Sequence, residues 1–273
     1  GPAAAGAPPG NPYAAPLANE REDGQAIGPV TTSGQLDIGR LMSESWELYK
    51  LQLLPCIAAQ LILGIASMVL TLLLASVAIG GFLLVANSWP LDAPATVSMI
   101  LVLTPCFVLY MFGVGWLQAG AIRFFLGVSR LGDAPLSELF SAGSAAVFLC
   151  GARLLLGVLI GLGTLACLVP GILLFLMFSQ VSYAVVDRRS GIIEAFHLSR
   201  RLTEGHKLEL VVVYLVMMAL SYLAGMVPCG LGVLFVAPYI QLLLSVTYLF
   251  LSGQSTAVSA ASEPASPFAQ GPP

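Results

Sequence analysis

The chain has 273 residues, of which 58% are hydrophobic and 9% are charged, and its formal net charge is −3. Soluble domains carry about 25% charged residues, so this composition excludes an ordinary soluble domain and predicts an integral membrane protein. The apolar runs are continuous rather than alternating, which indicates transmembrane helices and not barrel strands. The fold class is therefore predicted to be all-α, a polytopic membrane helical bundle. The small net charge gives no reason to expect a nucleic-acid partner.

The two ends of the chain differ from its middle. Residues 1–36 are rich in Pro, Gly and Ala and lack apolar periodicity, so they are predicted to be a disordered tail. The same argument predicts a second disordered tail at 253–273, where Ser, Ala, Pro and Gly predominate. The residues between them, 37–252, are predicted to form one transmembrane domain.

Six apolar runs in this domain approach or exceed the roughly 20 residues that a bilayer crossing needs. They are predicted at 53–86, at 95–126, in a third run ending near 168, and at 171–186, 208–226 and 233–252. The first run exceeds a minimal crossing, and the sequence leaves open whether it is one tilted helix or a broken one. Short amphipathic segments precede the three pairs of crossings and are predicted to lie on the membrane surface, at 37–49, 135–142 and 191–204. The domain is thus predicted to be three hairpins, each entered through an interfacial helix, as in three diverged repeats.

The basic residues predict the orientation. In a six-helix topology both tails share one side, and all eleven Lys and Arg residues fall on that side or at its interface. Arg153 belongs to the third run, and we expect its long side chain to reach the headgroups at the charged end. The positive-inside rule then places both termini and the three amphipathic segments of this multi-pass protein in the cytoplasm.

One segment carries a distinctive pattern: VPG at 169–171, an apolar run, and then VDRRSGIIEAFHLSRRLTEGHKLEL at 186–210. It resembles a group of bacterial six-helix membrane proteins related to the membrane domain attached to some glycerophosphoryl diester phosphodiesterases. The matching positions are Pro170, Gly171, Asp187, Gly191, Glu194, Ala195, Ser199, Leu202, Thr203, Gly205 and His206. The resemblance covers roughly 37–252 and departs after His206, where family members often carry an aromatic residue. It implies the fold and a membrane location but not phosphodiesterase activity, because no segment resembles the catalytic domain.

Basic side chains of this segment gather at the predicted cytoplasmic surface. Two interpretations are open: they orient the protein and attract anionic lipids, or they dock an acidic protein partner. This candidate lipid or partner surface consists of Arg188, Arg189, Arg200, Arg201, His206 and Lys207. We expect His206 to bond a backbone group or a lipid phosphate, with pH sensing as the alternative.

The sequence predicts no catalytic, cofactor or metal site. Glu194 and His197 share one helix face, but a di-metal site needs a second such pair and two more carboxylates. A solvated, ion-paired face is therefore the favoured interpretation. Cys167 and Cys229 fall in turns on the non-cytoplasmic side and are expected to be unpaired thiols, with a disulfide as the alternative.

Polar residues inside the crossings leave two functional hypotheses. The amides of Gln60, Gln118, Gln180 and Gln241 are expected either to bond between helices or to line a polar path. The first hypothesis is a non-enzymatic protein that binds lipid or a partner, as a scaffold or accessory subunit. The alternative is a transporter or permease of small or amphipathic molecules. A continuous cavity contacting the last three amides would favour transport, and a filled interior would favour the scaffold.

Overall fold

A computed structural model describes residues 37–88, 95–188 and 191–262, and its regular elements within those ranges are all helices. The first hairpin is α1 (Ile38–Leu51), α2 (Leu53–Ser88) and α3 (Ala95–Leu131). The second is η1 (Leu136–Phe140), α4 (Gly143–Ala166), α5 (Leu168–Met177) and α6 (Val181–Arg188). The third is α7 (Ile192–Thr203), α8 (Lys207–Met226), η2 (Pro228–Gly230) and α9 (Leu231–Leu251), followed by α10 (Ala257–Ser262).

The predicted all-α membrane bundle is confirmed. Across the described ranges, six helical spans are long and apolar enough to cross a membrane, with α5 and α6 together forming the fourth. The long first run is one continuous helix of 36 residues, which settles the alternative left open by the sequence. At about 1.5 Å per residue α2 is roughly 54 Å long, well beyond the roughly 30 Å of a bilayer core, so the α2–α3 hairpin must tilt strongly or project.

Three boundaries differ from the predicted ones. The fourth crossing, expected at 171–186 without interruption, is broken at residues 178–180. The segment 135–142 forms a short 3₁₀ helix, η1, instead of an amphipathic α-helix. The tail predicted to begin at 253 still contains α10, which packs against α1 and α3.

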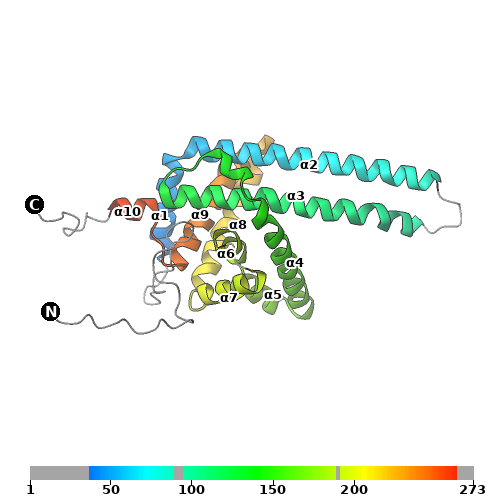
Figure 1. Cartoon of the computed structure of the whole chain (residues 1–273). Coiled ribbons are helices and arrows are strands. Elements are labelled where there is room, and N and C mark those ends of the chain that lie inside the picture. The colour runs from blue at the N-terminus through cyan, green and yellow to red at the C-terminus, as the bar shows by residue number, and fades with distance from the viewer. Residues whose placement is uncertain (1–36, 89–94, 189–190, 263–273) are drawn as a thin grey trace, which may run out of the picture.

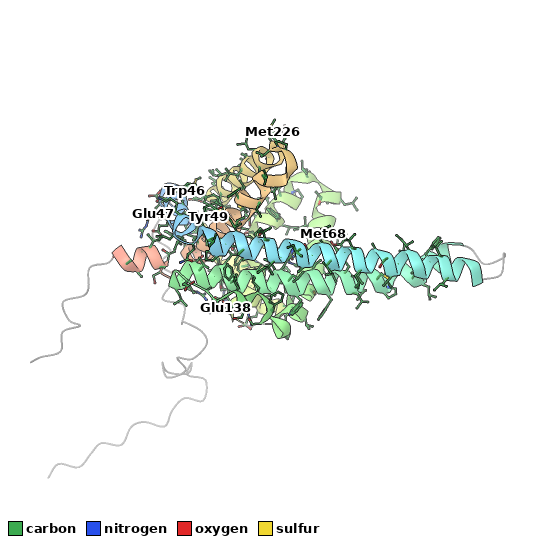
Figure 2. All side chains as sticks on the ribbon, turned by 90° about the horizontal axis from the view of Figure 1, so that it is seen from above. Trp46, Glu47, Tyr49, Met68, Glu138 and Met226 are labelled. Atoms are coloured by element: carbon green, nitrogen blue, oxygen red, sulfur yellow. The ribbon has the colours of Figure 1, made fainter. Side chains whose placement is uncertain are left out.

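The three hairpins pack together at one end and diverge toward the other. Figure 1 shows α2 and α3 running side by side away from the remaining helices, while α4 leaves α3 at a steep angle. In Figure 2, Met226 at the end of α8 lies to one side of the α2–α3 hairpin. Buried apolar side chains follow the same division, because Phe124 and Leu249 near the charged ends of α3 and α9 are fully covered, whereas Val158 and Met218 farther along α4 and α8 are 56% and 65% exposed. The far halves of the hairpins therefore meet lipid rather than one another.

The amphipathic helix α1 contacts α2, α3, α9 and α10 at the packed end of the bundle. Asp37 caps it by accepting hydrogen bonds from the backbone N–H groups of Gly39 and Arg40, at 2.9 and 3.3 Å. Glu44, which the sequence placed among the polar residues of this helix, is buried and accepts from Arg40 Nε at 2.7 Å and from the Thr256 hydroxyl at 2.6 Å. The residues after α9 are thereby held against the first interfacial helix.

The second hairpin is fixed to the first by a close backbone approach at Gly120 of α3. A Cβ built on Gly120 would lie 1.7 Å from the carbonyl oxygen of Leu139 in η1, so only a glycine lets the chain pass there. We expect Gly120→Ala to destabilise the folded protein by about 1–3 kcal/mol, the usual cost of forced overpacking, because the backbone of η1 must move.

The measurement is the thermal unfolding midpoint in detergent. Gly157→Ala is the matched control, because a Cβ at this exposed helical glycine of α4 would meet nothing within 4 Å. An equal midpoint for the two variants would contradict the close packing of η1 on α3.

Candidate functional site

The break in the fourth crossing is held by two hydroxyl groups of α7. The Ser199 hydroxyl donates to the carbonyl of Met177 at 3.1 Å and accepts from the N–H of Gln180 at 3.3 Å. The Thr203 hydroxyl donates to the same carbonyl at 3.0 Å. A helix end inside a membrane protein leaves backbone groups without intrahelical partners, and these hydroxyls supply them. Two of the motif residues therefore serve to fix a helix break.

A third motif residue, Asp187, ties the end of α6 to the other two hairpins. Its carboxylate lies 2.6 Å from the Arg130 guanidinium of α3 and accepts a 2.9 Å hydrogen bond from the Tyr248 hydroxyl of α9. Arg130 also donates from Nε to the Gln254 side chain at 3.0 Å. The carboxylate is largely covered, so this polar cluster is a structural clamp at the packed end of the bundle.

The glycines of the motif serve turns and close packing. Gly205 has a φ of +95°, the left-handed conformation that a residue just after a helix commonly adopts. A Cβ on Gly171 would lie 3.0 Å from Thr164, so Gly171 and the adjacent Pro170 start α5 tightly against α4. Gly191 is the residue before α7, and its carbonyl accepts from the N–H of Ala195 at 3.0 Å.

The predicted basic surface is only partly exposed. Arg200, Arg201 and Lys207 are exposed, whereas Arg188 is half-buried, and its Nε and Nη2 atoms make no hydrogen bond to the described part of the chain. The Nδ1 atom of His206 is buried and, within the same ranges, also lacks a partner. Arg189 lies outside the described residues.

Glu194 and His197 do not belong to a built site. Both are exposed on the outer face of α7, and neither forms a hydrogen bond or ion pair with another described residue. No group of three or more His, Cys, Asp or Glu side chains suited to a metal occurs in the described ranges. Cys167 is an exposed free thiol, and the side chain of Cys229 lies outside the description, so the unpaired state expected for both thiols stays a prediction.

Electrostatic perturbation outside the crossings is modest. Partial burial raises the pKa of Glu138 in η1, and the nearby Arg123 guanidinium opposes this by lowering it. Burial also raises the pKa of Tyr49 in α1, whose hydroxyl donates to the carbonyl of Phe235 at 2.8 Å. Both groups support packing at the interface and indicate no acid–base chemistry.

A polar cavity lies where the hairpins begin to diverge. Its volume is about 200 Å³, and side chains of all three hairpins line it. The lining residues that carry polar groups are Gln118, Arg153, Ser179, Ser182, Tyr183, Tyr214 and Gln241. Ser179 lies in the helix break that α7 stabilises, and Ser182 follows the break in α6. The cavity thus brings residues of the broken crossing together with polar residues of the other two hairpins.

The lining residues share a depth. Tyr214 is seven residues from the charged end of α8 at Lys207, Arg153 is ten from Gly143, and Gln118 is thirteen from Leu131. At about 1.5 Å per residue these positions lie roughly 10 to 20 Å from the charged helix ends. The cavity is therefore within the apolar spans and not at the charged ends of the helices.

Arg153 is the unusual member of this lining. It lies inside the span Ala145–Ala166, part of its side chain is exposed, and it makes no hydrogen bond or ion pair within the described residues. We expected this side chain to reach the headgroups at the charged end, but the structure places it at the cavity. An arginine at the centre of a membrane helix costs at least about 2.5–3.5 kcal/mol, so the guanidinium needs water or an anion.

The predicted amides separate into two groups. Gln118 and Gln241 line the cavity, and the buried Gln118 Oε1 has no hydrogen-bond partner in the described ranges. Gln180 is fully buried beside the break and, like Gln60, is absent from the lining. The cavity therefore contacts two of the three amides that a continuous path was expected to join.

Arg153, Tyr183 and Tyr214 were missed as site residues by sequence reasoning. The available signal was that polar residues of separate crossings lie at similar depths from their charged ends. The break at 178–180 was also missed, because no glycine or proline marks it.

The Asp187 clamp can be tested directly. We expect Asp187→Asn to lower the free energy of unfolding by about 2 kcal/mol, because Arg130 and Tyr248 lose a charged, largely covered partner. Thermal unfolding in detergent measures this, and Glu194→Gln, which neutralises an exposed carboxylate of the same motif, should leave the midpoint unchanged. If the two variants melt together, the clamp does not stabilise the bundle.

Comparison with known proteins adds no assignment. No protein-family model, curated protein or solved structure matches the chain. The chemistry of the site therefore rests on its own geometry.

Proposed function

We propose that the protein is a non-enzymatic, multi-pass protein of the bacterial inner membrane that binds single membrane lipids or similar amphiphiles. The observation that carries this proposal is the polar cavity at the base of three diverging apolar hairpins. A soluble ligand would gain little from exposed apolar walls, whereas an amphiphile can place its head in the cavity and its chains in the hydrocarbon. The resemblance in the α7 segment supports a membrane role and implies no catalytic activity.

The proposed orientation places the packed end and both termini in the cytoplasm. Nine of the eleven Lys and Arg residues lie in the described ranges, and eight of these nine lie on α1, α6, α7 or the charged ends of α3 and α8. The ninth is Arg153. The exposed Arg200, Arg201 and Lys207 would attract anionic lipids by about 1 kcal/mol each, and the same surface is where a protein partner would dock.

A second candidate is transport of amphipathic molecules. The broken fourth crossing lines the cavity, and discontinuous helices often form the substrate sites of transporters. Movement of a labelled lipid between leaflets of proteoliposomes separates this candidate from binding alone, since a pure lipid-binding protein leaves the transbilayer rate at that of protein-free vesicles.

The proposed topology can be tested by thiol labelling. In a cysteine-free background, single cysteines introduced at Asp92, Ser190 and Ser255 should react differently with a membrane-impermeant thiol reagent in intact cells. Only position 92 should be labelled from outside, because the other two belong to the basic side. Labelling of position 190 from outside would overturn the orientation and the cytoplasmic placement of the basic surface.

The proposed binding of lipid in the cavity can be tested by substitution of a lining amide. Gln241→Leu keeps the side-chain size but removes a polar group from the lining, so it should reduce the lipid retained through detergent purification by several-fold. Native mass spectrometry measures the bound lipid. Gln60→Leu is the matched control, because this amide also lies in a crossing but does not line the cavity.

Equal lipid retention by wild type, Gln241→Leu and Gln60→Leu would show that bound lipid does not use the cavity. Absence of any retained lipid from the wild type would remove the lipid-binding proposal itself.

A further inference from the structure

We propose that the cavity selects anionic amphiphiles, with the Arg153 guanidinium as the counter-ion of a phosphate or carboxylate headgroup. This inference rests on the proposed lipid-binding function and names the class of ligand. It is carried by the position of one unpaired charge among polar groups contributed by three hairpins.

The charge balance of the cavity is one-sided. Among the described residues that line the cavity, Arg153 is the only cation, and none is an Asp or Glu. The Asp187 carboxylate of the clamp is already shared by Arg130 and Tyr248. Arginine presents a planar fork of donors that matches the two oxygens of a phosphate or carboxylate, so an anion satisfies both the charge and the hydrogen-bonding geometry.

The size of the cavity limits what enters it. A volume of about 200 Å³ is smaller than the roughly 300–1,000 Å³ of pockets that enclose whole drug-sized ligands. Only a headgroup fits, and the acyl chains must stay outside. Beyond the cavity, α4 and α8 carry exposed apolar side chains such as Val158 and Met218, along which acyl chains can lie.

The aromatic lining does not favour a cationic headgroup. Choline or ethanolamine would need a carboxylate or an open ring face. The Tyr183 ring stacks on Tyr248 with centroids 5.7 Å apart, and the Tyr214 ring packs edgewise on Phe175 at 5.0 Å. With these rings engaged and no carboxylate in the lining, a zwitterionic headgroup gains less than an anionic one.

The test uses the full-length protein and two lipids with identical acyl chains, phosphatidylglycerol and phosphatidylcholine, supplied in equal amounts. Native mass spectrometry after detergent purification gives the ratio of the two lipids retained. We expect the wild type to prefer phosphatidylglycerol by about tenfold and Arg153→Gln to show a ratio near one. Arg153→Lys should keep part of the preference, because it retains the charge but loses the fork of donors.

Lys50→Gln is the matched control, because it removes an exposed cation of α1 that belongs neither to the cavity nor to the basic surface, and it should leave the ratio unchanged. Arg201→Gln tests the basic surface itself. If Arg201→Gln abolishes the preference and Arg153→Gln does not, selection takes place at the cytoplasmic surface and the inference is wrong. A wild type that retains both lipids equally would also overturn it, while leaving lipid binding itself intact. A wild type that retains neither lipid would remove both proposals.

A soluble anion is distinguished in the same experiment. Glycerol phosphate added in large excess should not displace phosphatidylglycerol, because it lacks the chains that contact the apolar walls. Displacement at millimolar concentration would identify a water-soluble anion as the ligand and overturn the assignment to an amphiphile.

Discussion

The shared carbonyl of Met177 is the point on which the arrangement of the site depends. A transmembrane helix cannot be interrupted in hydrocarbon unless its freed backbone groups find partners, and here Ser199 and Thr203 of α7 provide them. The interruption turns α6 across α4 and α7 and lets Ser182 and Tyr183 face the cavity. Helix α7 is thus more than an amphipathic element resting on a membrane surface. Its hydroxyl groups stabilise the interruption of the fourth crossing.

The molecule also divides into a cohesive end and a lipid-facing end. Near the charged helix ends, the Asp187 clamp and the Glu44–Thr256 hydrogen bond join all parts of the chain. Farther from these ends, the contacts are mainly between the two crossings of the same hairpin, and large apolar side chains are exposed. Without a hydrophobic drive between helices in lipid, only packing and polar contacts hold hairpins together, so their divergence follows from where those contacts are placed. The polar cavity marks the boundary between the two regimes.

Much of this architecture could be predicted from hydropathy alone. The six crossings, the three hairpins and the end of α7 at Gly205 follow from run lengths, charges and one glycine. The break at 178–180 could not be predicted, because Phe178, Ser179 and Gln180 are compatible with a continuous helix and only the distant hydroxyls of α7 make the turn stable. The burial of Glu44 depends on Thr256, more than 200 residues away, which no local pattern reveals. The role of Arg153 likewise depends on which helices surround it, and its position in the run suggested only a side chain that reaches outward.

The unequal lengths of the hairpins have a consequence for the surrounding bilayer. Helix α2 has 36 residues, whereas α8 and α9 have 20 and 21, yet all three begin or end at the same packed base. A flat bilayer of uniform thickness cannot match both lengths at the same tilt. The α2–α3 flank therefore tilts more than α8–α9, meets a thicker bilayer, or projects beyond the membrane. In the first two cases the shape of the protein is coupled to the local thickness of the membrane.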